Sequence, residues 1–476
     1  MQHEHVGSYM VYLPMELHVH IRHKLITDPE TTISQLRSLR LVCKLFDTLW
    51  SPMVMHNMTL FTGDPIHHVN RLFDIVRDKG TTAAFTTTLT LRNWEFLEFR
   101  WSFWKLRNPW HYLSLDTLRH FKETLYCVQA RRYASLLPDK LQLPYLRCVR
   151  LFFPRSESNW ATYHLTRMLT AFSQLTELEL TIAVNVDMAY VAQCLRHLQG
   201  LRKLKLVILY VRRLGYLPQP EINRFSRFIA DNHNITHLTL RPCTRNFNLS
   251  ELFLDVPSNR PLILEHVSCN DNCQNFEGLL PHIQSLSSFE FQCDRSNTWC
   301  TTLSDAGIFP PTIKAYSLDP QITIYLMKHP GIVGLSIYEE GGTMSAIEGD
   351  QLCSILAQHS ATLHYLKITS PNLTLMLRTL QNELNFKQCK NLREIVLNGR
   401  YGAFYSPLTR ALWESDKSYH EKQIFPVLAH LNCSLTVVLK YVQVAIFDAC
   451  VEFCGKSDDS FVCNLAGRLV LEPWAT

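Results

Sequence analysis

The sequence predicts an α/β protein in which a short helical segment precedes an array of parallel strands, each followed by a returning helix. Ten copies of the pattern apolar-x-x-apolar-x-apolar fall between residues 146 and 392, at a mean spacing of about 27 residues. Segments with apolar residues at helical spacing lie between the copies, for instance over 188–198 and 222–229. Stacking of such strand and helix units gives a curved solenoid, with the strands inside and the helices outside.

The segment 13–52, near the amino terminus, predicts two or three short amphipathic helices. The first helix carries apolar residues four apart, namely Leu13, Leu17, Ile21 and Leu25. Its first turn accommodates Pro14, and a turn signal at 28–30 separates it from a second helical run over 36–49. So short a segment buries little surface, so we expect another body to cover its apolar faces. An ordinary helical start of a globular domain is the alternative.

The order of residues in this segment resembles an F-box. The segment reads LP-x-EL-x3-I-x3-L, then an acidic loop with proline, then L-x2-LRLVCK-x-F-x2-L-x2-P. In that family the segment docks on the Skp-type adaptor of a cullin-based ubiquitin ligase. Carried over by position, the adaptor-facing residues are Leu13, Pro14, Leu17, Ile21, Leu25, Leu39, Val42, Cys43 and Phe46. Many members have a Trp-Arg pair where this chain has Lys44-Leu45-Phe46.

Composition and charge exclude several classes of protein. The 476 residues are 46% hydrophobic and 19% charged, which excludes a disordered chain. The net charge of +5 comes from interspersed charges, so it implies no attraction to nucleic acid or membrane. The start of the chain lacks a secretory pattern, and Lys440, Gln443 and Asp448 interrupt the most apolar long stretch. With fifteen scattered cysteines, the chain is expected to be cytoplasmic or nuclear.

Between the helical segment and the repeats, 61–145 predicts a linker and a degenerate first repeat. A helix is expected to begin at Asp64-Pro65 and a strand to span 86–91. The stretch 94–112 then holds four tryptophans. We expect their rings to pack the helical segment against the array or to cover its open end. An aromatic recognition surface is the alternative.

The repeat region spans 146–400 and resembles the leucine-rich repeats of F-box proteins, after an F-box over 1–60. In each copy the second and third apolar residues are predicted to point inward. In the seventh copy these are Tyr316 and Leu318, after Ile313. Beyond residue 400 the pattern fades, and 401–476 is predicted to cap the array. An unrelated α/β domain with leucine-rich strands is the alternative.

By alternation, the residues beside the inward positions project from the concave face and are the candidate target-binding residues. They mix acidic, basic and aromatic groups, as surfaces for proteins do. The set is Glu177, Glu179, Lys203, Lys205, His237, Arg241, His266, Asn270, Glu290, Tyr338, Tyr365, Lys367 and Glu394.

The sequence shows no catalytic constellation. It lacks a P-loop, a dinucleotide fingerprint, Gly-x-Ser-x-Gly and His-Glu-x-x-His, so neither an enzyme nor a cofactor is predicted. His20 and His23 share a helical face, but no further metal ligands follow them. Cys269 and Cys273 are read as buried thiols, and no metal site is expected.

The resemblance implies the substrate-recognition subunit of an SCF-type E3 ubiquitin ligase. Its partners would be a Skp-type adaptor, through it a cullin, and a protein target on the concave face. Catalysis would be proximity supplied by scaffold geometry. The alternatives are a leucine-rich-repeat interaction scaffold acting outside ubiquitination and a receptor for a small ligand.

Overall fold

The structure is a computed structural model, and it divides the chain into two compact units. The first unit comprises Met1–Ile263 and Asn272–His282, and the second comprises Leu264–Asp271 and Ile283–Thr476. The residues that the structure describes are 57–60, 73–74, 77, 86–91, 132–133, 135–136, 143–153, 159–172, 174–183, 186–209, 222–243, 247–270, 272–292, 298–316, 318–338, 346–370, 389–400, 434–442 and 469–473.

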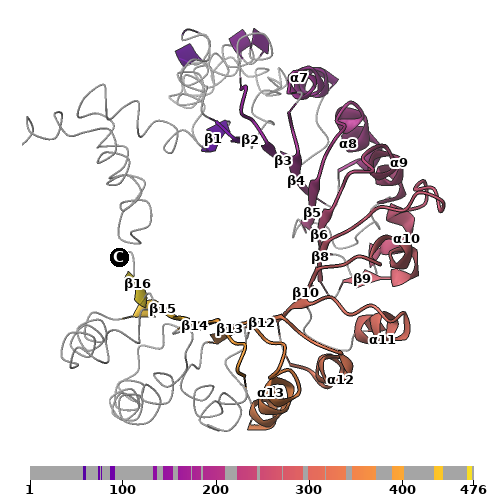
Figure 1. Ribbon diagram of the computed structural model, residues 1–476. Coiled ribbons are helices and arrows are strands. Elements are labelled where there is room, and N and C mark those ends of the chain that lie inside the picture. Colours follow the sequence, from indigo (N-terminus) through magenta and orange to yellow (C-terminus); the bar gives the residue numbers. More distant parts are fainter. Residues whose placement is uncertain are drawn as a thin grey trace, which may run out of the picture. The chain divides into compact units, whose positions relative to one another are not determined.

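The first unit contains a parallel sheet whose strands follow one another in chain order, from β1 to β6. These strands are β1 (Asn57–Leu60), β2 (Thr88–Leu91), β3 (Cys148–Phe153), β4 (Glu177–Ala183), β5 (Lys203–Leu209) and β6 (His237–Pro242). Its helices are α7 (Asn159–Thr170), α8 (Met188–Leu195), α9 (Ser226–Asp231) and the single turn α10 (Leu249–Leu252), with the 3₁₀ turns η6 (Ile222–Phe225), η7 (Phe276–Gly278) and η8 (Leu280–His282). Two short strands, β7 (Phe247–Asn248) and β9 (Cys273–Gln274), pair separately. Helices α7, α8 and α9 lie on one side of β3 to β6 (Figure 1).

The second unit repeats this arrangement. Its parallel strands, again in chain order, are β8 (His266–Asn270), β10 (Ser288–Gln292), β11 (Thr312–Ala315), β12 (Gly334–Tyr338), β13 (Tyr365–Ser370), β14 (Glu394–Arg400), β15 (Ser434–Val442) and β16 (Leu469–Pro473). Its helices are α11 (Thr298–Asp305), α12 (Pro320–Lys328) and α13 (Ala346–Gln358), on one side of β10 to β13 (Figure 1). The prediction of an α/β fold with parallel strands and connecting helices is confirmed. Parallel pairing also continues through β15 and β16, beyond the point where the sequence pattern fades.

The predicted alternation of buried and more exposed residues is confirmed in β4, β5, β6 and β11. In β2, β8 and β12 the residues between the inward ones, such as Ser268 and Ser336, are buried as well. In β4, Leu178, Leu180 and Ile182 are buried, whereas Glu177 and Glu179 are half-exposed. The buried residues face the helices and form the core with them. Because parallel neighbours pair in register, the exposed residues fall into rows across the sheet, and a slip of one residue would send them into the core.

The seventh copy corrects the sequence prediction. Ile313, expected to be the first apolar residue, pairs with Phe289, which is the second residue of the preceding copy. The inward positions are therefore Ile313 and Ala315, both fully buried. Tyr316 falls on the other face, where it is half-exposed, so its prediction as an inward residue was wrong. The buried Pro310 takes the place of the first leucine, and proline does not match the apolar pattern that was sought.

Helices α8 and α12 begin where the sequence provides a capping side chain. Asp187 accepts hydrogen bonds from the backbone N–H groups of Ala189 and Tyr190 at the start of α8, at 2.8 and 3.4 Å. Asp319 does the same for Ile322 in α12, with Pro320 in the first turn. The expected helical faces over 188–198 and 222–229 are confirmed as buried.

Buried polar side chains in the turns before the strands tie each copy to the one before it. In the first unit, Asn232 is 1% exposed. Its amide donates to the carbonyls of Leu198 and Phe228 at 3.0 and 2.9 Å, and its Oδ1 accepts from the N–H of Leu201 at 3.2 Å. One side chain therefore makes hydrogen bonds to three buried backbone groups.

Histidines have the equivalent role in three other turns. His282 accepts from the N–H of Leu262, and in the second unit His359 accepts from Ile332 and bonds to the carbonyl of Leu326. His329 lies between the N–H of Gly331 and the carbonyl of Pro310. Burial lowers the pKa of all three, to about 4 for His282. These bonds need a neutral ring, because a protonated ring has no acceptor nitrogen.

The helices 13–52, the aromatic stretch 94–112 and most of 401–476 lie outside the described residues, as do Leu13, Cys43 and the other predicted adaptor-facing residues. Within the part of the chain that is described, no helix has the length and apolar character needed to cross a membrane.

We expect Asn232→Ala to lower the free energy of unfolding by about 2 to 4 kcal/mol, because it removes three hydrogen bonds to buried backbone groups. The matched control is Asn234→Ala, at an exposed position two residues away, which should change it by about 0.5 kcal/mol or less. Urea unfolding followed by circular dichroism measures both. Equal effects would contradict the role given to Asn232.

The three buried histidines predict a loss of stability in weak acid. Unfolded histidine has a pKa of about 6.5, so between that pH and the lower pKa of the folded state the unfolded chain binds more protons. Stability is therefore complete above about pH 6.5 and falls as the pH drops toward about 4, the folded pKa of His282. Melting temperatures across this range measure it. His282→Gln should melt lower than the natural chain at neutral pH and lose less on acidification; an unchanged pH dependence would refute the assignment.

Candidate functional site

The strand face that points away from the helices is called the open face here. In the first unit it carries a set of charged and polar side chains that we call the charged face. The charged face consists of Arg150, Glu177, Glu179, Lys203, Lys205, His237 and Arg241. Five of the seven come from adjacent strands β3, β4 and β5, so register alone brings them together.

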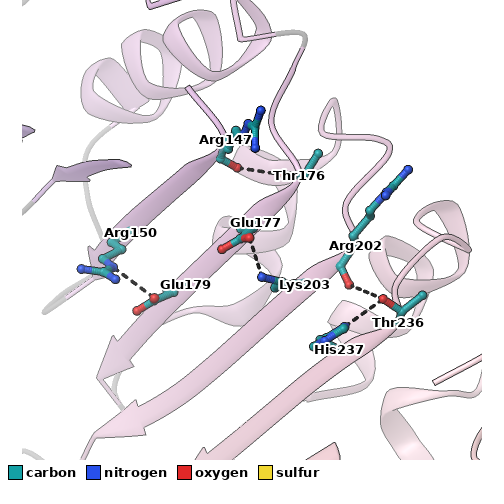
Figure 2. Close-up of polar contacts among 9 residues, drawn as sticks. All are labelled: Arg147, Arg150, Thr176, Glu177, Glu179, Arg202, Lys203, Thr236 and His237. Atoms are coloured by element: carbon teal, nitrogen blue, oxygen red, sulfur yellow. Dashed lines mark hydrogen bonds and ion pairs between the residues drawn. The ribbon is translucent and has the colours of Figure 1, made fainter. Parts of the chain in front are cut away.

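Opposite charges alternate across neighbouring strands of the charged face (Figure 2). Glu179 pairs with Arg150 at 3.0 Å on one side and with Lys205 at 3.3 Å on the other. One row nearer the strand start, Glu177 pairs with Lys203 at 2.7 Å. Each carboxylate thus has a cation on a neighbouring strand, which favours this register over its alternatives.

Backbone hydrogen bonds at the strand starts hold these rows in place. The carbonyl of Arg147 accepts from the N–H groups of Thr176 and Glu177, at 2.9 and 2.8 Å. The carbonyl of Arg202 likewise accepts from the N–H groups of Thr236 and His237. The Thr236 hydroxyl also donates to this carbonyl, at 3.4 Å (Figure 2). The same doubled bond recurs in the second unit, where the carbonyl of Glu265 accepts from Ser287 and Ser288. The first row of side chains therefore starts from a fixed backbone.

The ion pairs of the charged face contribute little to stability. Their cations are 38–50% exposed, and exposed ion pairs are worth about 1 kcal/mol or less each. Their effect is to orient the side chains. His237 is oriented similarly, because its Nδ1 lies 2.9 Å from the hydroxyl of Thr236.

The open face of the second unit has a different character. It carries a cluster of rings and charges that we call the tyrosine–lysine cluster, made of Glu290, Lys314, Tyr316, Tyr338 and Lys367. The rings of Tyr316 and Tyr338 stack, with centroids 5.0 Å apart. The ammonium of Lys367 lies 5.5 Å from the centroid of the Tyr338 ring, a cation–π contact. Glu290, only 12% exposed, accepts from the Tyr316 hydroxyl at 3.2 Å and pairs with Lys314 at 3.9 Å.

Tyr365 and Glu394 extend this cluster onto strands β13 and β14. Burial, the Glu394 carboxylate and Tyr338 raise the pKa of Tyr365, in decreasing order of effect. The Tyr365 hydroxyl therefore keeps its proton at neutral pH and can donate a hydrogen bond to a bound group.

The predicted site residues thus separate into two surfaces. Glu177, Glu179, Lys203 and Lys205 come together, and Tyr338 meets Lys367, as alternation predicts. His266 and Asn270 lie on β8, next to β10, which carries Glu290 of the cluster. Strands β10 and β11 separate them from Tyr338 on β12.

Sequence reasoning missed Arg150, Lys314 and Tyr316. Arg150 was available from the alternation of CVRLFF, since its neighbours Val149 and Leu151 are the inward residues. Lys314 and Tyr316 were hidden by the shifted reading of the seventh copy. The residue that marks the true start of this copy is Pro310, which is buried and lies three residues before Ile313.

The groups that these surfaces present differ in chemical kind. Among the described residues, no three of His, Cys, Asp and Glu are grouped to hold a metal ion. Cys148 lies on the open face beside Glu177, but burial, and then Glu179, raise the pKa of its thiol to about 11. Its thiol is therefore protonated and a poor nucleophile at neutral pH. What both surfaces offer is oriented charge, aromatic rings and hydrogen-bond donors.

A comparison with models of known protein families finds none that matches this chain, and a comparison with curated proteins finds no match either.

The stacked tyrosines should be energetically coupled. We expect a double-mutant cycle of Tyr316→Leu and Tyr338→Leu to give a coupling of about 0.5 to 1.5 kcal/mol in the free energy of unfolding. Tyr316→Phe keeps the ring and loses only the hydroxyl bond to Glu290, so it is the matched control and should keep most of the coupling to Tyr338. Additive effects of the two leucine substitutions would show that the rings do not interact.

Proposed function

We propose that this chain is the substrate-recognition subunit of an SCF-type E3 ubiquitin ligase. The F-box-like segment 13–52 would bind the Skp-type adaptor, and through it a cullin. The strands would form a leucine-rich-repeat solenoid whose concave side is the open face, where a protein target binds. The chain would contribute proximity: it holds the target where a ubiquitin-charged enzyme reaches its lysines.

The observation that carries the target-binding half is the open face itself. A strand face that only closed a core would be apolar, yet here it presents oriented ion pairs, stacked tyrosines and a lysine over a ring. Mixed charge with tyrosine and arginine is the composition of protein interfaces. In-register rows from consecutive strands give such a surface the breadth that a folded partner or a peptide needs.

The solenoid is supported by the regularity of the strands. In each unit they pair in parallel and in chain order, and the repeated pattern places equivalent residues side by side. The buried ties at Asn232 and His359 join neighbouring copies in the same way. Nearest-neighbour contacts of this kind are the defining property of repeat arrays. The adaptor-binding half is supported by the sequence motif.

The test of the adaptor-binding half is capture of a purified Skp-type adaptor by the full chain. Leu13→Ala with Pro14→Ala should reduce capture by about tenfold or more, because both positions belong to the adaptor-facing pattern and buried anchors dominate interfaces. The matched control is Leu254→Ala with Pro257→Ala, the same residue types at exposed positions of the first unit, which should capture normally.

Undiminished capture by the Leu13 and Pro14 variant would refute the role of the F-box-like segment. Failure of the natural chain to capture any adaptor would favour a leucine-rich-repeat scaffold that acts outside ubiquitination. Thermal melting of each variant shows that the rest of the chain is still folded.

A further inference from the structure

We infer that the charged face of the first unit binds an acidic segment of the target protein. This inference rests on the proposed function and names the chemistry of what the open face recognises.

The first observation is an excess of positive charge. The charged face holds two carboxylates, Glu177 and Glu179. It holds four cations, Arg150, Lys203, Lys205 and Arg241, so its net charge is +2 with His237 left out of the count. Three of the four cations lie on β3 and β5, on either side of the two glutamates of β4.

The second observation is the depth of the charges. The two carboxylates are the less exposed partners, with 35% exposure for Glu177 and 28% for Glu179. Arg150 and Lys203 are 48% and 50% exposed. A partner that approaches the open face thus meets the cations more than the carboxylates.

The third observation is that the cations are already oriented. Glu179 holds both Arg150 and Lys205, and Glu177 holds Lys203. Long basic side chains lose much conformational freedom when a partner fixes them. Here the glutamates have fixed part of that freedom beforehand, so an incoming carboxylate loses less binding free energy to ordering.

The spacing of the cations indicates the form of the acidic segment. Lys203 and Lys205 are two residues apart on one face of β5, a distance of about 6.6 Å. Alternate side chains of an extended peptide have this same spacing. An extended segment with acidic residues at alternate positions therefore matches the two lysines, with Arg150 within reach across β4.

The glutamates also argue against nucleic acid as the partner. A phosphate backbone places a charge at every nucleotide and cannot skip a position. Glu177 and Glu179 would repel part of such a continuous row. A peptide can place a neutral residue opposite each glutamate.

The second unit provides the contrast. There Lys367 lies over the Tyr338 ring, Lys314 pairs with Glu290, and Glu394 adds a second carboxylate to the row of Tyr365. Two cations and two carboxylates on this surface cancel. Because this surface has no net charge, it offers an acidic segment no net electrostatic attraction.

The test uses the full chain and a fluorophore-labelled peptide of alternating glutamate and serine, with binding followed by fluorescence anisotropy. The variant Arg150→Gln, Lys203→Gln, Lys205→Gln should bind it about tenfold or more weakly, because three charge-assisted contacts are lost. The matched control is Lys314→Gln, Lys328→Gln, Lys367→Gln, which makes the same change of charge on the second unit and should bind like the natural chain. Since exposed ion pairs add little stability, both variants should melt close to the natural chain.

Two further probes sharpen the test. A peptide with glutamine in place of glutamate should not bind, and one with the same composition but with its glutamates in adjacent pairs should bind more weakly than the alternating peptide. Equal loss in both variants, or tighter binding of a single-stranded oligonucleotide than of the peptide, would overturn the inference.

Adaptor capture measured on the same samples separates the two proposals. Capture without peptide binding overturns the acidic-segment inference and leaves the ligase assignment standing. Peptide binding that the first variant loses, in a chain that captures no adaptor, supports the charged face and overturns the ligase assignment.

Discussion

The in-register pairing of parallel strands is the constraint on which the rest of each unit depends. Side chains alternate between two faces, so the register decides at once which residues form the core and which are presented outward. Two kinds of interaction hold it: doubled hydrogen bonds at the strand starts, as at the carbonyl of Arg147, and burial of apolar pairs such as Leu178 and Leu180. A one-residue slip would bury the charges of Glu177 and Glu179 without partners, which costs several kcal/mol for each charge. The open face and the core are thus specified by the same register.

In the turns before the strands the backbone leaves the sheet, so its N–H and C=O groups lose the hydrogen-bond partners that the sheet provides. Asn232, His282, His329 and His359 each place a side chain where those backbone groups would otherwise be buried and unpaired. Asparagine does this with a neutral amide at any pH. A histidine accepts a backbone hydrogen bond only when its ring is neutral. Burial lowers the pKa of the ring, so these repeats are stable at neutral pH and lose stability when acid protonates the histidine. Asparagine and histidine thus bond to the same kind of buried backbone group, but only the stability contributed by histidine depends on pH.

Much of this fold follows from the sequence, since apolar alternation is a local signal that burial enforces. Glu177, Lys203 and Lys367 reach the open face as alternation predicts. The seventh copy fails for a local reason: Pro310 replaces the leucine that marks the start, and the reading moves by three residues to Ile313 and Tyr316. The buried ties were not predicted, because a polar residue in a turn looks like surface unless the backbone groups around it are known. Contacts such as Lys367 over Tyr338 join residues from different copies, and their geometry depends on side-chain conformations that no periodic pattern encodes.

The two open faces have different physical characters although one repeat pattern produces both. On the charged face, the glutamates are less exposed than the cations they pair with, so a partner bound there as we propose would be selected by charge and its affinity would fall with salt. In the tyrosine–lysine cluster, the charge of Lys367 is directed toward a ring and that of Lys314 toward a carboxylate, so shape and apolar contact dominate there. Charge attracts partners over a longer range, whereas stacked rings discriminate at contact. The repeats allow this division of roles, because open-face residues can vary from copy to copy while the inward residues preserve the register.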